Sequence, residues 1–461
     1  MIGSRNQGLT FGILIAAFTV AVPAIAQESP GGAIVVSTGL ISNLVARPID
    51  ESQDISQTVM GTYTEGTVVT KGRLDAQFLP ANGYGLLELR LLGTATLGSG
   101  VGYNGPVTIY SSSRTSIDAR KRILLTSSGL RWQPSDVQCS TQIVIHAIEA
   151  HRRVIERMAW RRAGRMQGSV EQAASWQGEI RTGQSIDRLV NRGLATGNDM
   201  IHERLGPSGK QLDLASRLRI NTTSARLFAV MFPSADIAVD LGPHPRIDPR
   251  ADGGIVLHEV LVGDVGRTLL SGSTVSDKEM LSLMNLLVGS HPRPLWVHAR
   301  EPRWKVTFAK AEPLSVRFSD GQVRFRLTID RVEIDGQETV ESMVVAADYQ
   351  LEISEDGPVL IRRGHVRVLD EFENKLPELS IGQQFMRRKF RGVFLPKIRF
   401  LGLIPPAGSN WAPLRGLELK QLTSHNGWLT LVYEIAPDTK RAPLPIMLAP
   451  TAEMSEDSVT R

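Results

Sequence analysis

Hydrophobic and polar positions alternate with a period of two from Gly83 to Leu130. In the first part of this stretch, the apolar residues that share one face are Leu87, Leu89, Leu91, Ala95 and Leu97. A second alternation follows Gly98–Gly105, a glycine-rich run that we expect to form a hairpin loop. The pattern is typical of long antiparallel strands with one buried face and one solvated face.

A similar alternation recurs from Asp320 to Val368. The positions there that we expect to face the interior are Val323, Phe325, Leu327, Ile329, Tyr349 and Leu351. The two halves of the chain also start alike. A glycine pair, an apolar triplet and further apolar positions occur in Gly31–Leu44 and, with a gap of one residue, in Gly253–Val265. We interpret this similarity as a degenerate internal duplication.

The period changes between Ser140 and Arg204, where Ala, Gln, Glu and Arg replace the β-branched residues. Apolar residues recur there at helical spacing, and several glycines predict breaks, so we expect two or three helices and not one rod. Together these patterns predict an α+β protein. It has long antiparallel curved sheets in two pseudo-repeated halves, with a helical, Arg-rich insertion at 140–204.

The chain divides on this basis into residues 27–242, a turn-rich linker at 243–252, and residues 253–436. Residues 1–26 have the features of a secretory signal peptide, with Arg5, an apolar run, and Ala24-Ile25-Ala26 before Gln27. We therefore expect an exported protein, periplasmic or extracellular; the alternative is that the segment is retained as an anchor. Residues 437–461 are proline-rich and charged without periodicity, and we expect them to be disordered.

The net charge of +5, from 52 basic and 47 acidic residues, is small for 461 residues and does not by itself indicate nucleic-acid binding. Basic residues do cluster in one part of the predicted helical segment. These residues are Arg152, Arg153, Arg157, Arg161, Arg162 and Arg165. Guanidinium groups bind phosphate and carboxylate groups through paired hydrogen bonds, so we expect this cluster to bind anions.

A second basic cluster contains Arg387, Arg388 and Lys389 and is interleaved with phenylalanines. The phenylalanines are Phe385, Phe390, Phe394 and Phe400. Basic and aromatic residues together favour an anionic membrane surface or lipid head group. Because we expect export, we do not expect nucleic acid as a partner. For both clusters, the alternative is a solvated basic face over an ordinary core.

No catalytic motif accompanies these features. His258-Glu259 begins like a metalloprotease helix, but position 262 is valine, so the second histidine ligand is missing. The sequence also lacks a nucleophile elbow, a phosphate loop and a dinucleotide-binding fingerprint. We expect no cofactor and no metal site, and we interpret the single Cys139 as a buried, inert thiol.

The block Thr62–Leu125, with VGYNGPVTIY at 101–110, resembles an uncharacterised family of exported bacterial proteins, which implies no known activity. In architecture alone, a capped short helix followed by long curved strands, occurring twice, is similar to the tubular lipid-binding superfamily. Domains of that superfamily wrap a long sheet around a helix and hold lipid tails between the two. The resemblance implies a lipid-binding architecture here.

A long sheet whose inner face is incompletely covered by helices leaves an apolar groove. We expect such a groove to be lined by Leu87, Leu89 and Leu91 and by the six inward positions of the second half. The sequence thus favours a non-enzymatic protein that binds a hydrophobic or amphiphilic ligand or the cell-envelope surface. The alternatives are a structural or protein-interaction module with fully packed sheets, and a hydrolase whose catalytic residues are scattered along the chain.

Overall fold

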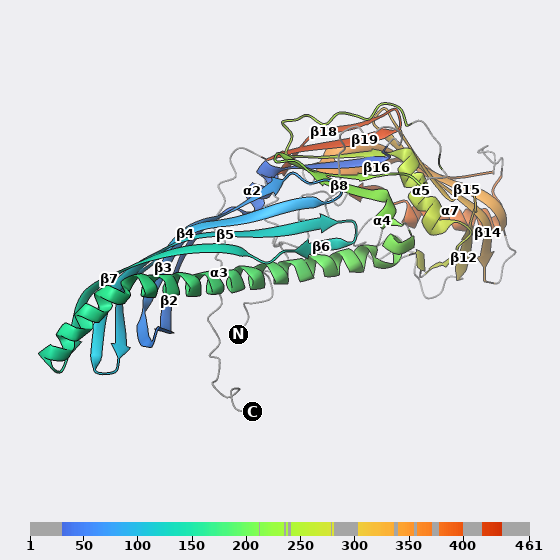
Figure 1. Ribbon diagram of the computed structural model, residues 1–461. Helices are drawn as coiled ribbons and strands as arrows, with labels where there is room; N and C mark the ends of the chain where they lie inside the picture. Colours follow the sequence, from blue (N-terminus) through green and yellow to red (C-terminus); the bar gives the residue numbers. More distant parts are fainter. Residues whose placement is uncertain are drawn as a thin grey trace.

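The computed structural model describes residues 30–211, 213–234, 237, 241–277, 279–280, 303–335, 340–354, 357–370, 378–399 and 417–435. The described part is elongated and consists of three antiparallel sheets with accompanying helices (Figure 1). The predicted α+β class with long antiparallel sheets is therefore confirmed. The predicted signal peptide at 1–26 and the tail at 437–461 lie outside the described residues.

The central sheet joins the two halves of the chain, because its strand order is β18-β19-β10-β1-β9-β8. Its strands are β1 (Gly32–Ser37), β8 (Leu218–Thr222), β9 (Arg226–Met231), β10 (Gly253–His258), β18 (Leu417–His425) and β19 (Trp428–Ile435). In the middle of this sheet, β1 and β10 pair antiparallel with Ile34 opposite Ile255. A helix follows each of them directly: α2 (Thr38–Val45) and α5 (Glu259–Leu270).

The halves correspond residue by residue around this central pair. A shift of 221 residues relates Ile34 to its partner Ile255. The same shift relates Ser37 to His258, which are the N-caps of α2 and α5. The shift therefore needs no gap in this region, unlike the alignment made from the sequence. A strand, a helix, a long meander, a helix and a hairpin occur in this order twice, which confirms the two pseudo-repeated halves.

The first outer sheet has the order β2-β3-β4-β5-β6, and β7 also pairs with β5. Its strands are β2 (Arg47–Val59), β3 (Thr62–Leu79), β4 (Gly85–Asn104), β5 (Val107–Thr126), β6 (Gly129–Trp132) and β7 (Asp136–Ala150). The expected loop at Gly98–Gly105 is wrong, because β4 continues to Asn104 and turns at residues 105–106. A register shift between Leu97 and Gly100 marks a bulge, which accommodates the glycines within the strand.

One continuous helix, α3 (Arg153–Gln211), runs along this sheet (Figure 1). The helical insertion is confirmed, but the prediction of two or three helices is wrong. The residues that we expected to begin the first helix belong to β7 instead. The glycines lie inside α3, where Gly178 and Gly183 would place a Cβ 3.4 Å from Cys139 Sγ and 3.6 Å from Val137 Cγ2. Tertiary contact with β7 thus overrides their low helix propensity.

The second outer sheet has the order β11-β12-β14-β15-β16-β17, and β13 pairs with β14. Its strands are β11 (Thr274–Ser276), β12 (Trp304–Phe308), β13 (Leu314–Ser319), β14 (Gln322–Ile334), β15 (Val340–Ser354), β16 (Gly357–Leu369) and β17 (Lys397–Arg399). Helix α7 (Ile381–Val393) contacts β15 and β16, and the short α4 (Leu214–Arg217) precedes β8. Within the described ranges, no helix is long and apolar enough to cross a membrane.

Candidate functional site

The residues that we expected to line a groove lie mostly in one packed core. Leu87, Leu89, Val323, Leu327, Ile329, Tyr349 and Leu351 are buried in this core, whereas Leu91 and Phe325 are half-buried. The Phe325 ring packs edge-on against Tyr349 at 5.6 Å, and Tyr349 Oη donates a hydrogen bond to the Leu395 carbonyl at 3.0 Å. Two hollows of about 480 and 360 Å³ are present on the described surface, and none of the nine residues lines either one.

Among the described residues, the edge of β7 is covered by polar side chains of α3 and not by another strand. The backbone N–H groups of Ile143, Thr141 and Cys139 donate to Glu171, Ser175 and Glu179 at 2.9, 2.9 and 3.1 Å. We call this series of three hydrogen bonds the edge clasp. Uncovered strand edges are prone to pair with other chains, so the clasp protects β7 while it holds α3 against the sheet.

The first predicted basic cluster lies at the narrow end of the molecule, where α3 starts. We call residues 152–166 the arginine arm. Its six arginines are all exposed, and no ion pair of theirs is described within the covered part of the chain. The first described hydrogen bond from α3 to the sheet comes only after the arm, from Gln167 Nε2 to the Ile143 carbonyl at 3.1 Å. The arm therefore presents its charges to solvent.

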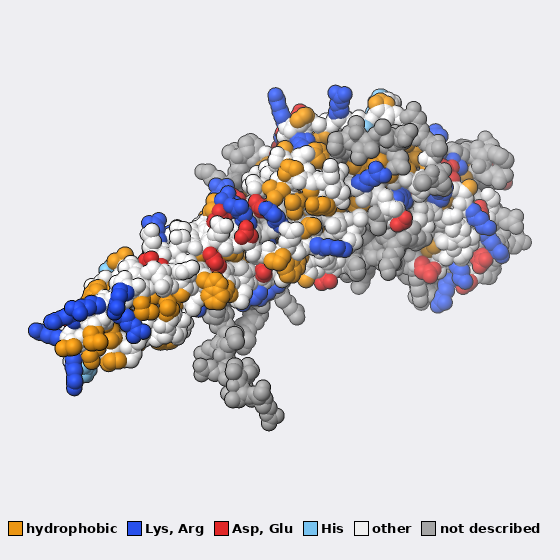
Figure 2. Space-filling view, in the orientation of Figure 1, with side chains coloured by type: hydrophobic (Ala, Val, Ile, Leu, Met, Phe, Trp, Pro, Cys, Tyr) orange, Lys and Arg blue, Asp and Glu red, His pale blue; other side chains and the backbone are white. Residues whose placement is uncertain are grey.

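Apolar side chains are exposed among these arginines. Val154 is 67% exposed and Met158 is 65% exposed, and Trp160 is also exposed. At 100° per residue, Val154 and Met158 fall close to the arc that Arg157, Arg161 and Arg165 occupy on the helix. Figure 2 shows blue cationic and orange apolar groups side by side at this end.

The strand ends beside the arm add further exposed rings. Ala150, the last residue of β7, pairs with Val107, the first residue of β5. The exposed Tyr103 and Tyr110 lie on the strands that meet at this end, and Tyr63 pairs with Tyr103. Tyrosine suits a membrane–water boundary because its ring is apolar and its hydroxyl is polar. Sequence reasoning missed these rings, because the bulge between Leu97 and Gly100 shifts the period of two before Tyr103.

The second basic cluster has a different environment. Phe385, Phe390 and Phe394 are buried in the main core, and Lys389 is only 2% exposed, with Nζ 5.0 Å above the Phe385 ring. Burial lowers the pKa of Lys389. The phenylalanines thus belong to an ordinary core, and Lys389 is buried with them and not on a solvated face. Arg388 is exposed and Arg387 is half-buried, whereas Phe400 lies outside the described residues. Anion binding by Arg387, Arg388 and Lys389 stays a prediction.

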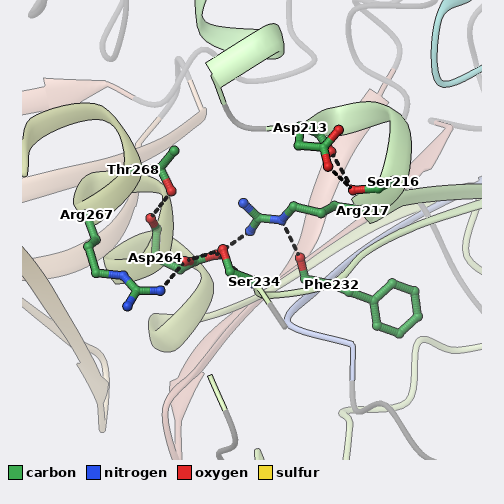
Figure 3. Close-up of polar contacts among 8 residues, drawn as sticks. All are labelled: Asp213, Ser216, Arg217, Phe232, Ser234, Asp264, Arg267 and Thr268. Atoms are coloured by element: carbon green, nitrogen blue, oxygen red, sulfur yellow. Dashed lines mark hydrogen bonds and ion pairs between the residues drawn. The ribbon is translucent and has the colours of Figure 1, made fainter. Parts of the chain in front are cut away.

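A buried polar network, which sequence reasoning missed, centres on Asp264 of α5 (Figure 3). Its carboxylate accepts hydrogen bonds from Arg217, from Arg267 at 3.2 Å, and from the backbone and hydroxyl of Ser234 at 2.9 and 2.8 Å. Burial alone would raise the pKa of Asp264, but the Ser234 hydrogen bonds and the two arginines outweigh burial and lower it. The network ties α4 and the segment after β9 to α5, so we assign it a structural role.

The described residues offer no group of three or more His, Cys, Asp or Glu side chains placed to hold a metal ion. The His258 side chain instead accepts a hydrogen bond from the Val260 backbone N–H at 3.2 Å and caps α5. Cys139 is a free thiol, and burial raises its pKa to about 11.

No protein-family model matches this chain, and no curated protein matches it. A solved structure with some likeness is a crystal structure of lipopolysaccharide binding protein. The two chains share 11% sequence identity with a TM-score of 0.23, and the match covers 88% of this chain and 99% of that chain. At this level of likeness, the ligand of that protein says nothing about the ligand of this one.

Proposed function

We propose that this protein is exported and binds anionic amphiphiles at a cell-envelope surface through the arginine arm, without catalysing a reaction. One observation carries the proposal: six exposed arginines without described ion pairs share a helix end with exposed Val154 and Met158. A solvated basic face needs no exposed apolar side chains among its charges. A surface that contacts lipid head groups and the first acyl carbons uses both cationic and apolar side chains.

The proposal concerns a surface and not an enclosed groove. The predicted groove residues are largely buried in a packed core, and the two hollows described lie elsewhere. Each basic residue near an anionic membrane contributes about 1 kcal/mol, so three arginines together contribute about 3 kcal/mol. The exposed valine, methionine and rings add an apolar contribution that does not depend on salt.

Vesicle binding tests this function. The full chain should sediment with vesicles that contain phosphatidylglycerol and should bind phosphatidylcholine vesicles poorly. Binding should weaken as salt rises, because charge attraction decays over about 8 Å at physiological ionic strength. The triple substitution R157Q/R161Q/R165Q should weaken binding by about 100-fold, which corresponds to about 3 kcal/mol.

A matched control removes the same charge from α7. The triple substitution R387Q/R388Q/R391Q leaves the buried Lys389 in place and should change vesicle binding by less than the arm substitution does. Equal losses for both triples would show that net charge alone drives binding and would overturn the assignment to the arm. Thermal unfolding of both variants checks that the fold is intact.

Export is tested separately, by mass spectrometry of the protein made in a Gram-negative host. The mature chain should begin at Gln27 and be recovered from the periplasm or the medium. Recovery of a chain that still begins at Met1, in the membrane fraction, would contradict cleavage.

A further inference from the structure

We infer that the hollow of about 480 Å³ between α5 and the β13–β14 ribbon is a binding site for a phosphate-type oxyanion. The site is separate from the arginine arm and does not depend on the function proposed for it. Its volume falls within the usual range of small-ligand sites, about 300 to 1,000 Å³. Four arginines from three elements line it: Arg267, Arg317, Arg324 and Arg326.

The strand register concentrates three of these charges on one face. Arg317 lies directly opposite Arg324 across the β13–β14 ladder, and Ser315 lies opposite Arg326. Arg324 and Arg326 are two residues apart, so they point to the same side of the ribbon. Like charges directly opposite each other destabilise a sheet. A negatively charged ligand between these side chains would remove that cost.

Three of the acidic residues nearby are already engaged. Asp264 accepts hydrogen bonds from two arginines and Ser234, as described above. Asp348 is shared between Arg324 at 2.6 Å and Arg367 at 2.7 Å. Glu259 accepts a hydrogen bond from the backbone N–H of Phe318 at 2.7 Å. No ion pair of the exposed Arg317 is described within the part of the chain that the structure covers.

The chemistry of the lining selects oxyanions. Guanidinium groups present forked donors that match phosphate oxygens, and several such groups around one hollow favour a ligand with more than one negative charge. Val260 and Glu259, both in the first turn of α5, also line the hollow, so the positive end of the helix dipole lies near it beside one carboxylate. Three acids also line the hollow: Asp264 and Glu259, which are engaged as described above, and the exposed Glu312, which opposes this charge. A phosphate group, free or on a lipid head group, fits this arrangement.

Isothermal titration calorimetry of the full chain with inorganic phosphate, at constant ionic strength in chloride, tests the site. The chain should bind one phosphate, and R317Q should weaken binding tenfold or more, which corresponds to 1.4 kcal/mol or more. E312Q should strengthen binding because it removes the opposing charge. R331Q is the matched control: Arg331 lies on the same strand, outside the hollow, in an ion pair with Glu333 at 3.4 Å. It should change binding by less than twofold.

A second ligand distinguishes the two sources of phosphate. If the natural ligand is a lipid head group, soluble dihexanoyl phosphatidic acid should bind more tightly than inorganic phosphate and lose affinity in R317Q. If it is free phosphate, the lipid should bind no better. In phosphate-free buffer, R317Q should unfold at the same temperature as the unchanged chain or higher, because a like-charge pair is removed. The inference is overturned if the unchanged chain shows no saturable phosphate binding, or if R317Q and R331Q behave alike.

Discussion

Two buried charged groups, Lys121 and Asp264, have specific partners. Lys121 is fully buried, its Nζ lies 2.5 Å from the Asp187 carboxylate, and it also sits 4.0 Å from the centre of the Trp132 ring. The Asp264 carboxylate accepts hydrogen bonds from two arginines and a serine. Removal of an ion from water costs several kcal/mol, and partners of this kind offset the cost. These positions should therefore tolerate substitution poorly.

Substitution of Asp264 by Asn tests this view. The change leaves Arg217 buried beside a neutral amide, so the free energy of unfolding should fall by about 3–5 kcal/mol. Because the folded protein lowers the pKa of Asp264, ionised Asp264 stabilises the fold above the ordinary carboxyl range, and that stabilisation is lost as pH falls through the lowered pKa. Urea unfolding at neutral and acid pH should show that the difference between the two chains shrinks at low pH. A constant difference would contradict this role.

The residue scale also shows where sequence reasoning was incomplete. Phe385, Met386, Phe390 and Val393 are buried on one face of α7, as a period of 3.6 requires. We interpreted that stretch first by its composition and not by its period, so a buried core beneath it entered only as the alternative. The Asp264 network is different in kind. Arg217 and Ser234 lie 47 and 30 residues from Asp264, and no local pattern links residues so far apart.

At the scale of elements, α3 is the clearest case of tertiary contact overriding a local signal. Its glycines predict breaks because glycine is a poor helix former. In the structure, Gly178 and Gly183 instead face β7, against which the helix packs. The strand period of β4 and β5 was readable because both faces are uniform over many residues. The length of α3 could not be predicted in this way, because the helix depends on contact with β7, and the sequence within the helix does not contain that partner.

The close approach at Gly178 allows a direct test of how α3 sits. A Cβ at position 178 would lie 3.6 Å from the Cβ of Cys139, within the range of natural disulfides. In G178C, a mild oxidant should therefore form a bond with the native thiol. The bond should stabilise the protein by about 2–4 kcal/mol and vanish with reductant.

Titration of free thiols and thermal unfolding with and without reductant measure this effect. The control is G168C, because the structure shows open space around Gly168, and it should form no intramolecular bond. Equal oxidation of both variants would mean that α3 does not hold the described position against β7.

At the scale of the whole molecule, the central sheet makes the two halves interdependent. The duplicated starts of the halves were visible in the sequence as a glycine pair and an apolar triplet. Their meeting as neighbours, with β1 beside β10, was not visible, because strand pairing across more than 200 residues leaves no local trace. Each half contributes three adjacent strands, β8-β9-β1 and β10-β19-β18, to one six-stranded sheet.

This arrangement predicts that the halves fold together. A fragment of residues 27–242 alone would expose the edge of β1, and a fragment of residues 253–436 alone would expose the edge of β10. Each should aggregate or remain unfolded when produced alone, whereas co-expression should yield a soluble one-to-one complex. Size-exclusion chromatography decides the outcome. A soluble, cooperatively unfolding monomer from either fragment would show that the halves are independent domains.

The edge clasp pairs a helix with a strand, and the two elements advance by different distances at each step of the clasp. Four residues of helix advance about 6.0 Å, whereas two residues of strand advance about 6.6–6.8 Å. The offset between the helix side chains and the strand N–H groups therefore grows by about 0.7 Å at each step. Hydrogen bonds tolerate only a few tenths of an ångström of stretch, so agreement lasts for few steps. At the next step on one side, Gly183 has no side chain to donate or accept, and it packs against Val137 instead. The three hydrogen bonds can therefore form together at only one register, and they fix the position of the helix along the strand.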